Sequence, residues 1–215
     1  MILRGQSTIV YAVWTVLVIA AAVALIVQHW AMSFVALATL GASMVPSLVA
    51  RRYEIRLPLA FVSFVVLFIF ATLFLGESFD FYNRYWWWDI ALHALSAMGF
   101  GLVGFIFIFY LFEGDRYAAP AWAVAFFSWC FALAIGTVWE LFEFTMDAVF
   151  GTNMLKSGLP DTMGDLVVNL IGGAIGALSG FLYLLGQERG GLLAWLIADF
   201  VRLNRRLFSR ADKRR

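Results

Sequence analysis

The chain has 215 residues, of which 63% are apolar and only 13% are charged, and its mean hydropathy is +0.88. Soluble domains are about 45–50% apolar and about 25% charged, so this composition excludes soluble, disordered, collagen-like and coiled-coil classes. One cysteine, Cys130, excludes an intramolecular disulfide framework. A polytopic membrane protein remains. Its net charge of +1 conceals an asymmetry, because eight of the 15 Lys and Arg residues follow Gly186.

Six stretches are long and apolar enough to cross a membrane, which takes about 20 residues each. They are residues 8–28, 31–50, 58–75, 88–112, 119–149 and 165–186. The first is longer than the 7–15 residues typical of a signal-peptide core. Pro46 predicts a kink in the second, whereas Pro58 and Pro120 fall at the start of helices, where proline is tolerated. No linker or internal repeat divides these stretches, so we expect an all-α bundle of six transmembrane helices in one domain, residues 1–191.

Residues 192–215 form a tail with an apolar first part and a basic second part. Its basic residues flank a membrane span, which favours a helix lying on anionic lipid headgroups over nucleic-acid binding. With six spans, both termini share one side of the membrane with the second and fourth connections. That side carries 13 basic residues, and the other carries only Arg84 and Lys156. The positive-inside rule therefore places both termini in the cytoplasm.

Ionisable residues within membrane spans are costly and mark candidate functional sites. They are absent from the first three predicted spans and dense at one end of the last three. The fourth span begins with Asp89 and His93, and the fifth ends with Glu140, Glu143 and Asp147. The sixth opens with Asp165 and the polar Asn169, with Asp161 just before it or in its first turn. By the predicted orientation, all of them lie at the outer membrane face.

The spacing of these residues places each set on one helix face, because positions three or four apart are neighbours. The same faces continue inward as small residues, which allow transmembrane helices to approach closely. These small residues are Ala97, Gly101 and Gly104 in the fourth span, Ala132 and Gly136 in the fifth, and Gly172, Gly176 and Gly180 in the sixth. The pattern therefore predicts that the carboxylates face one another rather than lipid.

Six carboxylates, one imidazole and one amide close together favour the uptake of protons or of a cation. One His among oxygen donors suits Mg, Mn, Ca, Fe(II) or Zn, so we expect a divalent metal ion held by Asp89, His93, Glu140, Glu143, Asp161 and Asp165. Asp147 and Asn169 are secondary candidates. Other interpretations are structural: Asp161 caps the sixth helix, His93 is a buried core histidine, and the aromatic residues 82–88 form an interfacial belt.

Three motifs in this order resemble the YjdF-like bacterial inner-membrane proteins and, more remotely, the VanZ-like membrane proteins. The motifs are Asp89 with His93, Trp139-Glu140 with Glu143-Phe144, and Asp161-Thr162 with Asp165. Met163 and Gly164 stand where the family pattern has Gln and an aromatic residue. The resemblance covers about residues 58–186. It implies a helical inner-membrane protein with these site residues, and it implies no reaction.

Two function classes remain open. The first is a metal-dependent hydrolase or transferase acting on a lipid or lipid-linked phosphate at the outer leaflet, with Glu140, Glu143 and His93 as catalytic residues. The second is a cation- or proton-coupled transporter or sensor using the same carboxylates. Below Glu140 only scattered hydroxyl residues such as Ser128 and Thr137 continue the polar stripe, which favours a site open on one side. A helix-packing subunit without chemistry would leave the carboxylates unexplained.

Overall fold

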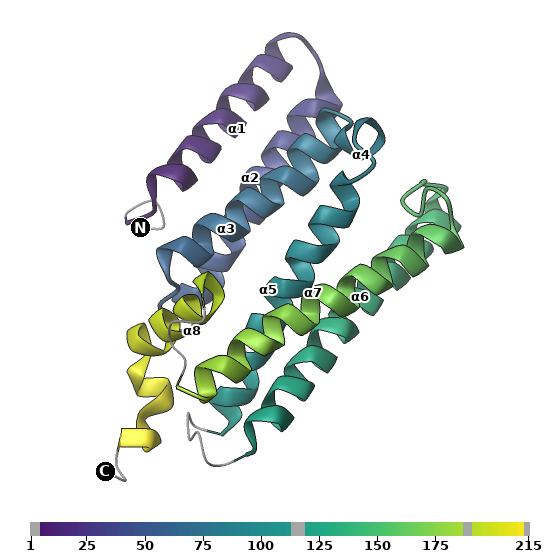
Figure 1. The fold of residues 1–215 in the computed structure, drawn as a ribbon. Helices are drawn as coiled ribbons and strands as arrows, with labels where there is room; N and C mark the ends of the chain where they lie inside the picture. Colours follow the sequence, from purple (N-terminus) through teal and green to yellow (C-terminus); the bar gives the residue numbers. More distant parts are fainter. Residues whose placement is uncertain (1–4, 113–118, 187–190, 213–215) are drawn as a thin grey trace. The chain divides into compact units, whose positions relative to one another are not determined.

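A computed structural model describes residues 5–112, 119–186 and 191–212, and all regular secondary structure among them is helical. Six helices are long and apolar enough to span a membrane: Thr8–Ile26 (α1), Trp30–Arg52 (α2), Leu59–Ser78 (α3 with η1), Trp88–Leu111 (α5), Ala121–Phe150 (α6) and Leu159–Leu184 (α7). The predicted all-α, six-span fold is therefore confirmed. Two compact units, Met1–Trp88 and Asp89–Arg215, make up the chain (Figure 1). The prediction of a single domain stays a prediction.

In the first unit, α1, α2 and α3 share an apolar core with small polar contacts between helices. Trp14 on α1 and Val66 on α3 are buried in that core. The Trp14 indole Nε1 donates to Ser43 Oγ on α2 at 2.9 Å, and the hydroxyls of Ser7 and Ser63 lie 2.6 Å apart. Hydroxyl contacts of this kind hold membrane helices together where lipid offers no hydrophobic driving force.

The third span changes from an α-helix (α3, Leu59–Ile69) to a π-helix (η1, Phe70–Ser78). The Thr72 hydroxyl bonds to the carbonyls of Phe68 and Ile69 at 3.0 and 3.1 Å, near the junction. A side-chain donor that competes for helix carbonyls is one recognised cause of such a change. The short helix α4 (Phe81–Arg84) follows. Neither feature follows from apolar periodicity, and neither is predicted from the sequence.

In the second unit, α5, α6 and α7 pack along the predicted small-residue faces. A Cβ atom built on Gly101 of α5 would lie 2.9 Å from the Gly173 carbonyl oxygen of α7. One on Gly136 of α6 would lie 2.7 Å from Asn169 Nδ2 of α7. At Gly101 the two backbones therefore approach more closely than a side chain would allow, and at Gly136 the missing Cβ leaves room for the Asn169 side chain. Figure 1 shows these three helices side by side, and their faces confirm the predicted packing.

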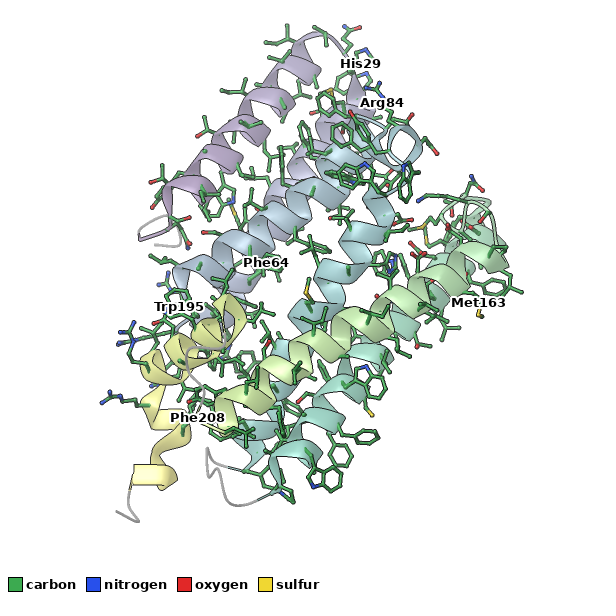
Figure 2. The ribbon with its side chains drawn as sticks, viewed as in Figure 1. His29, Phe64, Arg84, Met163, Trp195 and Phe208 are labelled. Carbon is green, nitrogen blue, oxygen red and sulfur yellow. The ribbon has the colours of Figure 1, made fainter. Side chains whose placement is uncertain are left out.

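The sixth spanning helix, α7, starts at Leu159, earlier than the predicted residue 165. Gly158 is its N-cap and Pro160 lies in its first turn, where the missing N–H of proline is harmless. Asp161 therefore lies inside the first turn rather than at the cap. Beyond α7, the tail forms α8 (Leu192–Leu203) and a 3₁₀ segment, η2 (Arg205–Asp212). Figure 2 places Met163 near the start of α7 and Phe208 of η2 near the opposite end of this unit.

Candidate functional site

Five of the predicted site residues come together at one end of the second unit. Asp89 and His93 come from the first turns of α5, Glu140 and Glu143 from α6, and Asp165 from α7. The spacing of four residues in α5 and three in α6 turns each pair to one side of its helix. His93, Glu140, Glu143 and Asp165 are buried, and Asp89 is partly exposed. The three helices pack closely one and two turns further along from these residues, and this packing brings the five side chains together.

His93 lies at the centre of this cluster. Its Nε2 lies 3.7 Å from Asp89 Oδ1 and 3.9 Å from Asp165 Oδ2, and its Nδ1 lies 3.7 Å from Glu140 Oε1. A neutral imidazole donates from one nitrogen and accepts or binds a metal through the other. Carboxylates on both sides therefore allow His93 to bind a cation on one side while a carboxylate on the other orients the ring.

Glu140 has no hydrogen-bond partner for either carboxylate oxygen among the described residues, and only 4% of the residue is exposed. A buried polar group without a partner costs about 1–3 kcal/mol, and a charged one costs more. Almost all buried polar groups in proteins have a partner. The exception at Glu140 therefore calls for a proton or a cation at this position.

Glu143 accepts a hydrogen bond that is not among the predictions from the sequence. The indole Nε1 of Trp139 donates to Glu143 Oε1 at 3.0 Å, from one helical turn away on α6. The spacing of four residues between the aromatic residue and the carboxylate is the signal that could have revealed this contact. Trp139 therefore fixes the orientation of one candidate ligand.

Lys156 is a second residue at the cluster that is not among the predicted site residues. Its ammonium group forms an ion pair with Asp89, the partly exposed member of the cluster. The loop that carries Lys156 is held by Asp147, which accepts hydrogen bonds from Thr152 Oγ1 and from the backbone N–H of Met154 and Leu155 at 2.6–2.9 Å. Asp147 therefore shapes the α6–α7 loop.

The remaining predicted residues lie outside the two groups of side chains whose ligand atoms are close enough to share an ion. Those groups are Asp89, His93 and Asp165, and His93, Glu140 and Glu143, each with its atoms within 4.8 Å of one another. Asp161 lies in the first turn of α7. Asn169 is buried one turn below Asp165, and its Nδ2 lacks a partner among the described residues.

Comparison with known proteins agrees with this architecture. Residues 9–186 match a family described as predicted membrane protein, DUF2238. The chain belongs to this family. Apart from Thr8, the matched range includes all six spans and every residue of the cluster, which agrees with the resemblance to an uncharacterised membrane family.

The chain is also similar to a protein of Thermotoga maritima described as "Uncharacterized protein". The two are 26% identical over 104 residues, which are 48% of this chain and 53% of that protein. The chain thus spans about half the length of the curated relative it matches. No solved structure matches. Membership of the family shows that the chain is a membrane protein. The chemistry of the site is argued from the residues that form it.

Proposed function

We propose that this integral membrane protein binds a divalent metal ion at the cluster of Asp89, His93, Glu140, Glu143 and Asp165. The observation that carries the proposal is Glu140: its two carboxylate oxygens are buried beside His93 and Glu143, and neither has a hydrogen-bond partner among residues 5–112, 119–186 and 191–212. Carboxylates and one imidazole suit Mg, Mn, Ca, Fe(II) or Zn. Glu140, Glu143 and His93 Nδ1 are the primary ligands in this proposal, with Asp89 and Asp165 facing the other ring nitrogen.

We further propose that the site serves hydrolysis or transfer on a lipid or lipid-linked phosphate. A divalent ion supplies Lewis acidity toward a phosphoryl oxygen. Lys156, one of two basic residues predicted on this side of the membrane, adds a positive charge at the partly exposed edge of the cluster. Asp165, across the ring from Glu140, is a candidate proton acceptor. The protein resides in the bacterial inner membrane with this site outside and both termini in the cytoplasm, as the 13 to 2 charge bias indicates.

A transporter or sensor using the same carboxylates is the second candidate, and the buried amide of Asn169 favours it by extending the polar region one turn inward. The hydroxyl groups near and below the cluster argue for the one-sided site. Ser96, Ser128 and Ser179 each donate to a carbonyl of their own helix, at 2.6–3.0 Å. Each of these hydroxyls donates its proton within its own helix, so none of the three donates to a neighbouring helix.

Thermal melting of the chelator-treated protein in detergent, with and without Mn²⁺ or Zn²⁺, tests the metal site. At 100 times Kd a ligand stabilises by about 2.7 kcal/mol, which for a chain of this size raises Tm by roughly 5–10 °C. We expect Glu140→Gln to lose most of that rise and Asp165→Asn to lose a smaller part. The double variant should lose less than the sum, because both residues act on one site.

The control is Asp80→Asn, which replaces an exposed carboxylate in the first unit and should keep the full metal response. If metal and chelator leave the wild type unchanged and Glu140→Gln melts higher, the cluster holds protons and the metal site is refuted. Uptake of Mn²⁺ into proteoliposomes distinguishes the two classes: a one-sided site binds the ion without accumulating it.

A further inference from the structure

A groove at the opposite end of the second unit carries a separate inference. It has a volume of about 450 Å³ and lies between the last turn of α7 and the helix α8 with the start of η2. Its lining passes from the buried Tyr183 to the exposed side chains of Trp195, Arg202 and Arg205. Small-molecule sites are typically about 300–1,000 Å³, so the groove is large enough for a lipid headgroup.

The walls of the groove are anchored to the spanning helices. Ala194 and Ile197 on the inner face of α8 are fully buried, and α8 packs against α7. Beyond the groove, the Phe208 ring stacks on Phe109 of α5, with centroids 5.5 Å apart, and meets Phe200 of α8 at 6.2 Å. The groove is therefore built by tertiary packing, and its position relative to α7 is fixed.

The charge on the groove suits an anion. Arg202 forms an ion pair with Asp199, whose side chain is only 11% exposed, so one edge of the guanidinium is held while its other N–H groups stay available. No ion pair involves Arg205 among the described residues, and its side chain is exposed. Arginine presents several N–H donors in a plane, which matches the oxygens of a phosphate group.

The groove also lies at the depth of lipid headgroups, because α7 spans the membrane and ends at Leu184 beside it. With 12 residues, α8 is too short to cross a bilayer. Trp195, with 48% of its surface exposed, has the character of an interfacial anchor. Basic pockets beside spanning helices attract anionic headgroups.

We propose that this groove binds the phosphate group of an anionic phospholipid from the surrounding bilayer, with Arg205 and Arg202 as the phosphate ligands and Trp195 against the glycerol and upper acyl chain. The site is independent of the metal site, since it uses none of the same residues. It differs from general attraction of the basic tail to the membrane, because it assigns the contact to particular arginines.

The adjacent arginines provide a matched test. Arg205 and Arg206 are both exposed and carry the same charge, but only Arg205 lines the groove. Binding of phosphatidylglycerol and of phosphatidylcholine is measured on the full-length protein in neutral detergent, by thermal melting and by mass spectrometry of bound lipid. We expect phosphatidylglycerol to raise Tm more than phosphatidylcholine does. Arg205→Gln should weaken its binding about fivefold, while Arg206→Gln leaves binding within a factor of two.

Two further arms close the test. Arg205→Lys keeps the charge and should give an intermediate affinity for phosphatidylglycerol. It distinguishes a loss of binding caused by the missing charge from one caused by misfolding of the glutamine variant. Inorganic phosphate at the same concentration should have no effect if the acyl chain contributes, and an equal effect would identify a free-phosphate site instead. Equal losses in Arg205→Gln and Arg206→Gln, or equal binding of the two lipids, would overturn the proposal.

Discussion

At the scale of single residues, α6 contains three carboxylates with different roles. Glu140 is buried without a hydrogen-bond partner in the part of the chain that the structure describes, Glu143 accepts from Trp139, and Asp147 accepts three hydrogen bonds from the following loop. The three positions are spaced three and four residues apart, so all of them lie on one face of the helix and the spacing does not distinguish their roles. Their tertiary surroundings separate them: Asp147 has three hydrogen-bond donors and needs no ion, whereas among the described residues no donor hydrogen-bonds to Glu140, and His93 lies 3.7 Å away.

Trp139 provides a prediction about the metal site. Trp139→Phe keeps an aromatic ring on the helix and removes the N–H that donates to Glu143. Partners that orient a metal ligand typically contribute 10–100-fold to affinity. Since 47% of Trp139 is exposed, we expect an effect at the lower end of this range, which is about a tenfold rise in the Kd for Mn²⁺. Titration of Mn²⁺ into the chelator-treated protein measures it.

Trp129→Phe is the matched control, because the Trp129 indole also donates from α6, in this case to the Leu170 carbonyl at 2.9 Å. That variant should lower Tm and leave the Kd for Mn²⁺ unchanged. Equal weakening in both variants would mean that the effect passes through helix packing, and no weakening in Trp139→Phe would remove its positioning role.

The sequence predicts which helix residues gather in the cluster better than it predicts the contacts that the α6–α7 loop makes with them. Asp89, His93, Glu140, Glu143 and Asp165 follow from helical spacing, because small-residue faces and polar stripes coincide on the same helices. Lys156 and the role of Asp147 do not follow, because they depend on the path of a loop. Loop paths are set by turn geometry, here by Gly151 at φ +67° and Gly158 at φ +73°, which leaves no periodic signal.

At the scale of helices, the close approach of α5 and α7 depends on glycine. A Cβ atom on Gly176 would collide with the backbone carbonyl oxygen of Met98 and lie 3.0 Å from the Cα of Gly101. Both neighbours are backbone atoms, which cannot move aside as a flexible side chain could. The same two helices carry His93 and Asp165, so this contact also controls the distances in the site.

Gly176→Ala should therefore destabilise the protein by about 1–3 kcal/mol, the range for overpacking a tight contact. The lost stability appears as a fall in Tm of several degrees in detergent. Gly164→Ala is the control on the same helix, since nothing lies within 4 Å of a Cβ built there. It should leave Tm unchanged or raise it slightly, because alanine favours the helix by up to about 1 kcal/mol. If Gly176→Ala melts like the wild type, α5 and α7 do not meet at this residue.

Apolar length was enough to locate all six spanning helices, but their ends and irregularities required more. The beginning of α7 at Leu159 lies in a polar stretch that apolar periodicity does not detect. The π-helical η1 is equally apolar to its α-helical neighbour α3, so composition carries no sign of the change. Helix termini and local helix type depend on caps and single hydrogen bonds, which contribute little to a hydropathy pattern.

At the scale of the whole molecule, the distribution of charge predicts which compartment each end of the second unit faces. The α6–α7 loop carries Lys156 as its single basic residue, whereas the tail beyond Gly186 carries eight. The anionic inner leaflet and the positive-inside rule both favour the basic end in the cytoplasm. The carboxylate cluster would then meet substrates and metal ions outside, and the arginine groove would meet anionic lipid inside.

Cysteine labelling tests this orientation. In a Cys130→Ala background, which should remain unlabelled, Asn153→Cys places a thiol in the α6–α7 loop and Arg206→Cys places one in η2; both positions are exposed. We expect a membrane-impermeant maleimide to label residue 153 in intact cells and residue 206 only after permeabilisation, because one spanning helix, α7, separates them. Labelling of both from the same side would mean that α7 does not cross the membrane. The reversed pattern would place the carboxylate cluster in the cytoplasm, where a lipid-linked substrate of the outer leaflet could not reach it.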